Sequence, residues 1–341
     1  MKRAETYCAP EGSLRIWFRS ISSVLPFLRI FVFVPLLPFA IPVTAEETPK
    51  PKKSEASVSV GYVLVPFILT DLKGKPTRGL KEKDVAVLVD GREVTTDLFA
   101  ASDDAPISFT ILLDGSGSMG LVGKLDGAKA AVRELVAQRR PGDDFALFVF
   151  AAGEVKEVVP FTTDGERIRT AVDAVHPFGR TAFFDALVKM PEKSLQGKNG
   201  ARAIILLTDG LDNASTLTRD DVAVILQTID VPVYPVGLRS PGSPTKPVEG
   251  ENVEGLLNLE ILGHIGRITG GRLAILNDAG RLPEAVRLIE KDLRAQYLVG
   301  FSPTGRGPVK YRRISLRISG PARLVRVRAG YSGTLPPFKG G

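Results

Sequence analysis

The sequence predicts an α/β protein: a doubly wound, mostly parallel sheet, with a small β module formed by the strands that flank it. Between about 107 and 301, apolar runs alternate with amphipathic helical patterns. Runs that are apolar on both faces and separated by such helices are typical of a parallel sheet covered on both sides. Before and after this region, two-residue alternation and turn signals indicate antiparallel strands. A chain of 341 residues is long enough for one large domain and a smaller one.

Residues 1–45 resemble a secretion signal. Basic residues precede an apolar stretch at 30–41, and short side chains at Val43 and Ala45 suit cleavage after Ala45. Three prolines within or beside the stretch make it a poor membrane helix. We therefore expect an exported protein that is periplasmic, secreted or on the cell surface, with membrane association only if this segment stays uncleaved.

Composition narrows the possible partners and chemistry. The only cysteine, Cys8, lies in the expected signal, so the mature chain would have no disulfide, zinc–thiolate site or cysteine nucleophile. The formal net charge is +7, of which residues 1–45 contribute three. That excess is mild and no basic run is interleaved with aromatic residues, so we expect no nucleic-acid partner.

A polar, proline-rich linker is expected at 46–56, followed by an N-terminal β module at 57–100. Two alternating apolar patterns predict strands in this module, and Asp90-Gly91 after the second is a hairpin signal. The alternating residues are Val58, Val60, Tyr62 and Leu64 in the first pattern, and Val85, Val87 and Val89 in the second.

The central domain is expected at 105–300. Strands are predicted at 107–113, 145–150, 155–159 (a short edge strand), 203–207, 231–236 and 273–276. A helix follows the first strand, with apolar residues from Leu125 to Val136 at three- and four-residue spacing. Further helices are predicted at 164–174, 182–196, 218–229, 256–268 and 281–296.

After this domain we expect a C-terminal β hairpin at 301–332 and a tail at 333–341. The strand with Ile314, Leu316 and Ile318 and the strand with Val325 and Val327 are separated by a Gly-Pro turn. We expect this hairpin to join the 57–99 strands in one sheet, since neither piece is large enough to fold alone. Its arginines are expected on the solvated face, with binding of an acidic polymer as the alternative. They are Arg313, Arg317, Arg326 and Arg328.

Hard oxygen ligands follow two of the predicted strands. Asp114-Gly-Ser116-Gly-Ser118 ends the first strand, and Thr208-Asp209-Gly210 ends the strand at 203–207. In open α/β sheets, ligands bind at the carboxyl ends of the strands. One carboxylate and two hydroxyls at alternate positions, joined by glycines that permit a tight turn, suit a small, hard divalent cation.

These residues resemble the von Willebrand factor type A (VWA) family, whose metal-ion-dependent adhesion site uses Asp-x-Ser-x-Ser, a later threonine and a later aspartate. The resemblance covers about 105–300 and points to five candidate metal-site residues: Asp114, Ser116, Ser118, Thr181 and Asp209. It implies a binding device and not an enzyme, with Mg²⁺ (or Mn²⁺ or Ca²⁺) as cofactor. It further implies direct coordination by both serines, water-mediated contact by at least one aspartate, and direct contact by Thr181 when ligand is bound.

More of the chain resembles a narrower group of exported bacterial VWA proteins, numerous in Acidobacteria, with β segments on both sides of the domain. The similar segments are 80–84 and 89–91 before the domain, and 296–301 and 329–331 at its end and after it. Val85 departs from the aromatic residue usual in that group.

Charge counting favours capture of an acidic group. Asp114 and Asp209 at best neutralise a divalent cation, and hydroxyls add no formal charge. Mg²⁺ prefers six oxygen ligands and keeps waters where the protein supplies few. An open position therefore remains, which in the VWA family is usually filled by an acidic side chain of a protein partner.

A dinucleotide-binding enzyme is one alternative, because Gly115-Ser-Gly117-Ser-Met-Gly120 fits Gly-x-Gly-x-x-Gly and Glu134 lies near the position of the acidic residue. In that case Asp114 would repel a pyrophosphate, and the roles of Thr181 and Asp209 would be unexplained.

A serine hydrolase using the 114–120 loop is a second alternative, although Ser116 and Ser118 lack the glycine flanks of a nucleophile elbow. We expect His264 to be packed in a helix and His176 to shape a loop. A structural module with a vestigial metal site is the third alternative. Beside the site, we expect Phe183 and Phe184 in a helix core and 212–213 to support the loop by hydrogen bonds.

Overall fold

The structure is a computed structural model that describes residues 62–101, 105–121, 123–227, 229–239, 253–276, 282–303, 308–321, 323–336 and 338. The expected signal at 1–45, the linker at 46–56, Val58 and Val60 lie outside the described residues. Among the residues described, no helix has the length and apolar character needed to cross a membrane.

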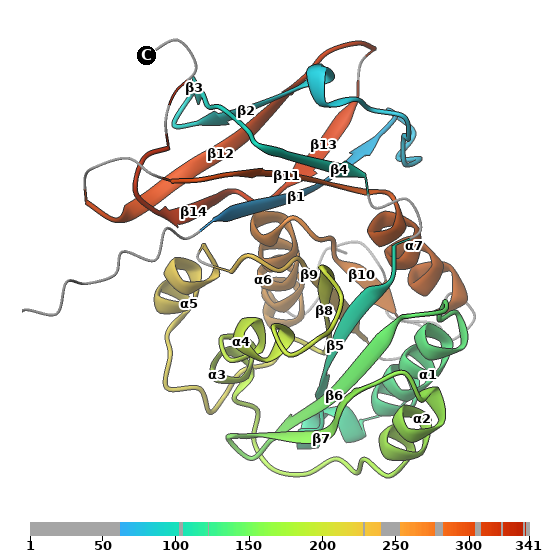
Figure 1. The fold of residues 1–341 in the computed structure, drawn as a ribbon. Coiled ribbons are helices and arrows are strands. Elements are labelled where there is room, and N and C mark those ends of the chain that lie inside the picture. Colours follow the sequence, from blue (N-terminus) through green and yellow to red (C-terminus); the bar gives the residue numbers. More distant parts are fainter. Residues whose placement is uncertain are drawn as a thin grey trace, which may run out of the picture. The chain divides into compact units, whose positions relative to one another are not determined.

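The central element is a six-stranded sheet in the order β10-β9-β8-β5-β6-β7 (Figure 1). All neighbouring strands pair in parallel except β6 and β7. The bounds are β5 Ile107–Asp114, β6 Asp144–Ala151, β7 Glu154–Thr162, β8 Ala201–Thr208, β9 Val233–Leu238 and β10 Ala274–Leu276. This confirms the predicted α/β fold class with a mostly parallel sheet.

Strand register brings the ends of three strands to one edge. Leu113 of β5 lies opposite Val149 of β6 and Leu207 of β8. Asp114, the last residue of β5, therefore lies at the same edge as the end of β8. This edge carries the residues for which the sequence predicts a metal site.

Helices cover both faces of the sheet because its strands are apolar on both sides. The side chains of Phe109, Ile111 and Leu113 pack with α1, α2 and α7, whereas Leu112 packs with the helices of the opposite face. The helices on the first face are α1 Lys124–Ala137, α2 Gly165–Asp173 and α7 Leu282–Arg294. Those on the second are α3 Phe183–Leu187, α4 Met190–Ser194, α5 Arg219–Leu226 and α6 Val253–Thr269.

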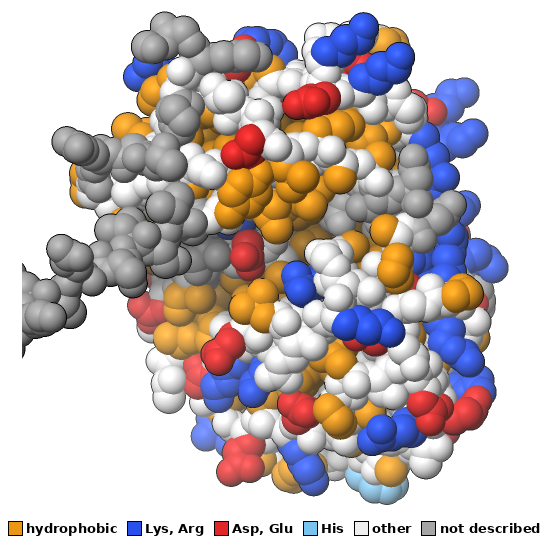
Figure 2. Space-filling view, in the orientation of Figure 1, with side chains coloured by type: hydrophobic (Ala, Val, Ile, Leu, Met, Phe, Trp, Pro, Cys, Tyr) orange, Lys and Arg blue, Asp and Glu red, His pale blue; other side chains and the backbone are white. Residues whose placement is uncertain are grey.

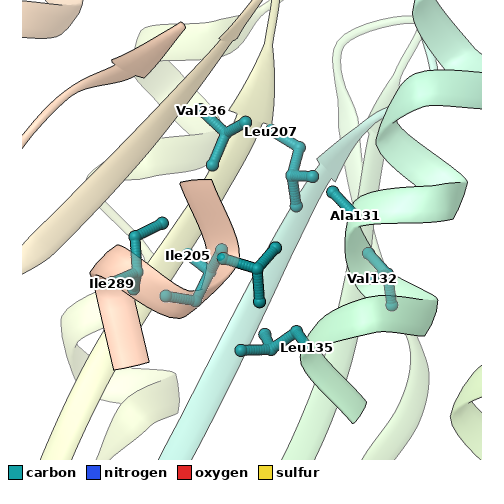
Figure 3. Close-up of a pocket in the computed structure, with 8 residues that line it drawn as sticks. Ala131, Val132, Leu135, Ile205, Leu207, Val236 and Ile289 are labelled. Carbon is teal, nitrogen blue, oxygen red and sulfur yellow. The ribbon is translucent and has the colours of Figure 1, made fainter. Parts of the chain in front are cut away.

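A small cavity of about 10 Å³ lies in the core of the first face, between α1, α7 and the central strands (Figure 3). Its lining includes Val132, Leu135, Ile205 and Ile289, and every other lining side chain is also apolar. A buried water needs polar partners, which this lining does not provide. The cavity is therefore part of the hydrophobic core.

The helix predicted at 182–196 is wrong as a single element. The structure has two short helices, α3 and α4, with Pro191 in the first turn of α4. Proline has no backbone N–H and clashes with the preceding turn, so a helix is broken just before it. Phe183 and Phe184 on α3 are buried, as expected.

The flanking strands form a second body, a sandwich of two four-stranded sheets. Their orders are β13-β1-β11-β4 and β14-β12-β2-β3. The bounds are β1 Val63–Thr70, β2 Val85–Val89, β3 Arg92–Glu93, β4 Leu98–Ala101, β11 Gln296–Phe301, β12 Lys310–Ile318, β13 Leu324–Val327 and β14 Gly330–Gly333, with a 3₁₀ turn, η1, at Glu82–Asp84. Val65, Phe67, Val89 and Val299 are among the buried residues between the two sheets.

The prediction that a C-terminal hairpin joins the 57–99 strands in one sheet is wrong. β12 pairs with β2, whereas β13 pairs with β1 in the other sheet. β11 also pairs with β1, although its residues were expected at the end of the central domain. Two sheets bury apolar faces against each other, which a single small sheet with one solvated face does not achieve.

Of the alternating apolar residues that predict β1, those that the structure describes lie on the outer side of that strand and not on the side that faces the core. Tyr62 and Leu64 are exposed, whereas Val63, Val65 and Phe67 are buried. Residues 63–69 contain one proline, at position 66, and are otherwise apolar. Because no polar residues alternate with apolar ones here, the sequence does not show which side of the strand faces the core.

Two of the basic residues in the C-terminal strands have environments that differ from the expected solvated face. Arg328 is buried, and its Nε donates to the Gly330 carbonyl at 2.7 Å. Arg326 forms an ion pair at 2.5 Å with Asp292, a fully buried residue of α7 that also pairs with Arg272. Arg313 is exposed, as expected. Arg326 thereby joins a strand of the sandwich to helix α7 of the central domain.

Candidate metal site

Three loops contribute the five candidate residues. Asp114 ends β5, and Ser116 and Ser118 belong to the following turn, with Ser116 preceding the 3₁₀ turn η2 (Gly117–Gly120). Thr181 lies in the loop before α3, and Asp209 directly follows β8. Asp114, Ser116 and Thr181 are buried, and Asp209 is 8% exposed.

The turn after β5 that carries Ser116 and Ser118, here called the serine loop, is folded around the Asp114 carboxylate. The Ser116 N–H donates to Asp114 Oδ1 at 2.9 Å, and the hydroxyls of Ser116 and Ser118 lie 3.1 Å apart. The Gly115 N–H donates to the Phe150 carbonyl at the end of β6. A Cβ at position 115 would lie 2.8 Å from Val149 Cγ1, so glycine is required by close packing.

Two backbone hydrogen bonds join the serine loop to the loop that carries Thr181. The Phe178 N–H donates to the Gly115 carbonyl at 2.9 Å, and the Gly117 N–H donates to the Gly179 carbonyl at 3.0 Å. Gly179 has a φ of +72°, which glycine adopts without steric cost.

Asn213 joins the Thr181 loop to the Asp209 loop. Its Oδ1 accepts from the Thr181 N–H at 2.9 Å, and its own N–H donates to the Thr181 carbonyl at 3.0 Å. Asp212 accepts from the Phe184 N–H at the start of α3. The expected supporting role of 212–213 is confirmed, and all three loops are thereby connected.

Asp114 is a buried carboxylate with two polar partners. Besides the Ser116 N–H, the Thr208 hydroxyl donates to its Oδ2 at 2.6 Å. Burial raises the pKa of Asp114 to about 6, because it disfavours the charged form. The hydrogen bonds from Thr208 and Ser116 act in the opposite direction, and the negative charge of Asp209 raises this pKa further. The two carboxylates are thus electrostatic neighbours.

Sequence reasoning did not identify Lys124 as part of this site. Its Nζ donates to Asp209 Oδ2 at 2.8 Å, and the side chains of Lys124 and Asp209 are 12% and 3% exposed. Lys124 is the first residue of α1, where the helix dipole disfavours a cation. A lysine at the start of a predicted helix is electrostatically unfavourable, so its position in the sequence was an indication that it has another role. Thr208 was also missed, since a threonine at the end of a buried strand reads as an ordinary core residue.

The donor set suits a small divalent cation. Mg²⁺ binds oxygen at about 2.1 Å in octahedral geometry, so adjacent ligands lie about 3 Å apart. The 3.1 Å between the Ser116 and Ser118 hydroxyls matches this separation. Within the described residues, no group of three or more His, Cys, Asp and Glu side chains is placed to hold a metal. A metal here would therefore depend on hydroxyls together with two carboxylates.

The geometry of the loop differs from that of the two enzymatic alternatives. Helix α1 begins at Lys124 with Gly123 as its N-cap, so the glycine motif at 115–120 does not lead directly into a helix N-terminus. His176 and His264 are both exposed. The expectation that His264 is packed is wrong, because its position lies on the outer side of α6, beside buried Leu262 and Ile265.

Comparison with known proteins adds a family to this geometry. The family model for the von Willebrand factor type A domain matches residues 109–211. An uncharacterized protein from Borreliella burgdorferi is 29% identical over 144 residues, which cover 40% of this chain and 42% of that protein. The chain thus matches less than half the length of this curated relative.

Solved structures with similarity to this chain include two bacterial proteins. A von Willebrand factor type A protein from Catenulispora acidiphila has 17% identity and a TM-score of 0.46, covering 80% of this chain and 74% of that chain. An aerotolerance-related membrane protein from Bacteroides fragilis has 22% identity and a TM-score of 0.43, covering 55% and 98%. The family match includes all five candidate residues, and residues 109–211 are a von Willebrand factor type A domain.

Proposed function

We propose that this protein is a divalent-metal-dependent protein-binding module. Asp114, Ser116, Ser118, Thr181 and Asp209 would hold Mg²⁺, or Mn²⁺ or Ca²⁺, at the carboxyl edge of the central sheet. An acidic side chain of a protein partner would complete the coordination of the ion. In this proposal the module acts outside the cytoplasm, as the apolar segment near the start of the sequence predicts.

The observation that carries the proposal is that hydrogen bonds join the three loops on which the five oxygen-bearing residues lie. Each loop is tied to the next by two hydrogen bonds of 2.9–3.0 Å, through Gly115 and Gly117 on one side and Asn213 on the other. These bonds hold the donors in place before any ligand arrives, which lowers the entropic cost of binding.

The buried carboxylates supply the affinity for a cation. Asp114 is removed from water, and its ionised form accepts hydrogen bonds from neutral groups of Ser116 and Thr208. A divalent cation would supply the missing positive charge, and the hydroxyls of Ser116 and Ser118 would add neutral ligands. Because these donors leave part of an octahedral shell unfilled, a carboxylate from outside has room to bind.

The surface around the site offers apolar as well as charged contacts. Leu121, which follows η2, and Phe178, in the Thr181 loop, are 59% and 60% exposed. On the face of the molecule seen in Figure 2, acidic and basic side chains are interspersed, and the broadest apolar patch lies over the sandwich strands. An acidic residue of the partner, flanked by apolar residues, would suit the surface around the site.

Calorimetric titration of Mg²⁺ into the protein tests the metal site. Ser118→Ala removes one hydroxyl ligand with little change to the core, since Ser118 is only half-buried. We expect this variant to bind Mg²⁺ at least about tenfold more weakly, as loss of one charge-assisted ligand interaction implies. Asp126→Ala is the matched control: this exposed residue lies in the first turn of α1, and its loss should leave affinity unchanged.

Partner binding is tested by capture from a cell-envelope extract, once with Mg²⁺ and once with chelator. Captured proteins should elute with EDTA, and the Ser118→Ala variant should retain fewer of them. Capture that persists in EDTA, or an unchanged Mg²⁺ titration in Ser118→Ala, contradicts the proposal.

A further inference from the structure

The ion pair between Lys124 and Asp209 places a cation of the protein itself at the proposed metal site. We propose that the Lys124 ammonium is a permanent component of this site: it competes with the divalent ion for Asp209, and it leaves the metal-loaded site with a net positive charge. This inference rests on the proposed function, and it explains why the metal-loaded site would prefer an acidic partner.

The position of Lys124 is not explained by helix stability. It is the first residue of α1, where the free N–H groups carry partial positive charge and a lysine is unfavourable. Its side chain is nevertheless 12% exposed and ends 2.8 Å from Asp209 Oδ2. A long lysine side chain usually keeps its ammonium in water. The burial of this one is therefore a consequence of its attraction to Asp209.

Lys124 contacts the Asp209 oxygen that does not accept from the Leu211 N–H. The other oxygen of Asp209, Oδ1, accepts from the Leu211 N–H at 3.2 Å, so Oδ2 is the one that faces a cation. A divalent ion near Oδ2 would lie within a few ångströms of the ammonium and would be repelled by it. The metal must either displace the ammonium from Oδ2 or share the carboxylate with it.

Charge counting gives the consequence for ligand binding. Asp114 and Asp209 carry two negative charges, and a divalent ion alone would make the site neutral. With Lys124 included, the loaded site carries +1. Asp212 and Arg180 also lie nearby and hydrogen-bond to neutral groups, but their opposite charges offset each other in this count. Lys124 thus determines whether the loaded site attracts an anion.

The inference predicts opposite effects of one substitution on two measurable affinities. Lys124→Met removes the charge and keeps most of the side-chain volume. We expect it to bind Mn²⁺ roughly tenfold more tightly, since a unit charge about 5 Å from a divalent ion costs that much even in a medium close to water. We expect its Mn²⁺-loaded form to bind acetate several-fold more weakly than the wild type does.

The experiment titrates Mn²⁺ calorimetrically and then measures the broadening of the acetate methyl signal by the Mn²⁺-loaded protein. Lys124→Arg keeps the charge and should resemble the wild type in both readouts. Lys129→Met is the matched control. It also removes one positive charge from α1, at a lysine whose Nζ donates to the Asp173 carbonyl and not to the site.

The outcomes separate this inference from the proposed function. If the wild type binds Mn²⁺ and Lys124→Met binds it no more tightly, or binds acetate as well as the wild type, the inference is overturned and the metal site stands. If only Lys124→Met binds Mn²⁺, the lysine excludes the ion and the proposed function fails. If neither binds it, both fail. Should Lys124→Met be unfolded in chelator, recovery of its circular dichroism spectrum on adding Mn²⁺ supports the inference and no recovery overturns it.

Discussion

At the scale of single residues, Asp114 lowers the stability of the metal-free fold but would provide a ligand for the proposed metal. A carboxylate with no exposed surface is costly to ionise, and burial raises its pKa to about 6. The Thr208 hydroxyl and the Ser116 N–H offset part of that cost. A bound cation would offset the rest of the cost of ionising Asp114. Metal binding and folding stability are therefore expected to be linked.

Replacing Asp114 by asparagine should reveal this cost in the metal-free protein. The folded-state pKa is raised above the ordinary value of 3.8, so the protonated carboxyl favours folding, and this contribution is lost as pH rises through about 6. The free energy of unfolding of Asp114→Asn, relative to the wild type, should therefore increase between pH 4 and pH 7 by up to about 3 kcal/mol. Urea unfolding in chelator measures it.

The same pair of proteins in Mg²⁺ provides the control. Only the wild type should then be stabilised by the ion, which reduces or reverses the difference at pH 7. A difference in unfolding free energy that does not change with pH would contradict the assigned environment of Asp114.

Residue types and their order in the chain were sufficient to propose the five candidate ligands. They were not sufficient to pair Lys124 with Asp209 or Thr208 with Asp114, because these contacts form only in the tertiary fold. No sequence spacing connects residue 124 with residue 209, because their approach depends on where α1 begins and on how β5 and β8 pair.

At the scale of elements, the site is a set of loops held by backbone hydrogen bonds. Gly179 is a key position in this set, because its carbonyl accepts from the Gly117 N–H and its φ is +72°. A Cβ there would lie 2.7 Å from the Cβ of Ala152 and 3.0 Å from its Cα. The Thr181 loop and the turn after β6 therefore fit together only when residue 179 has no side chain.

Gly179→Ala should weaken both folding and metal binding. The left-handed backbone and the clash with Ala152 together should cost about 2 kcal/mol or more of unfolding free energy. Mg²⁺ affinity should fall as well, because the Thr181 loop must move. Thermal unfolding and calorimetric titration measure the two effects.

Gly153→Ala separates backbone strain from the clash. Gly153 has a φ of +83°, but a Cβ there would have no atom within 4 Å. It should cost about 1 kcal/mol and leave Mg²⁺ affinity unchanged. Equal effects of the two alanines on metal binding would show that the close approach at Gly179 does not support the site.

Helices and strands were predicted correctly where the spacing of apolar residues along the chain matches the repeat of the helix or strand that they form. Every strand predicted for the central sheet is present, and the helix after β5 was predicted correctly because its apolar residues recur at helical spacing. It failed where one local feature outweighed the pattern, as with Pro191 between α3 and α4. It also failed where pairing is non-local, as with β12 and β13.

At the scale of the whole described chain, buried charges connect the central domain with the sandwich. Asp292 on α7 has no exposed side-chain surface and pairs with Arg272, which follows α6, and with Arg326 on β13. The Ala329 N–H also donates to the Ile268 carbonyl at the end of α6. Helix α7 leads almost directly into β11, so the chain passes from one body to the other next to this cluster.

Asp292→Asn should destabilise this junction. Loss of the buried negative charge leaves two arginines without their partner, and breaking a buried ion pair costs about 3 kcal/mol. Asp173→Asn is the comparison, since Asp173 and Arg133 form an exposed pair worth less than about 1 kcal/mol. Calorimetric unfolding would measure both. Similar small losses for the two variants would contradict a stabilising role for the Asp292 cluster.

The sequence alone determined the fold class of the central domain and the order of five oxygen-bearing residues, because both depend on patterns that are local in the chain. The tertiary structure decided which loops meet, that a lysine lies against Asp209, and that the flanking strands divide between two sheets. Those features depend on contacts between residues far apart in sequence, and the free energy that selects them comes from the packing of whole elements.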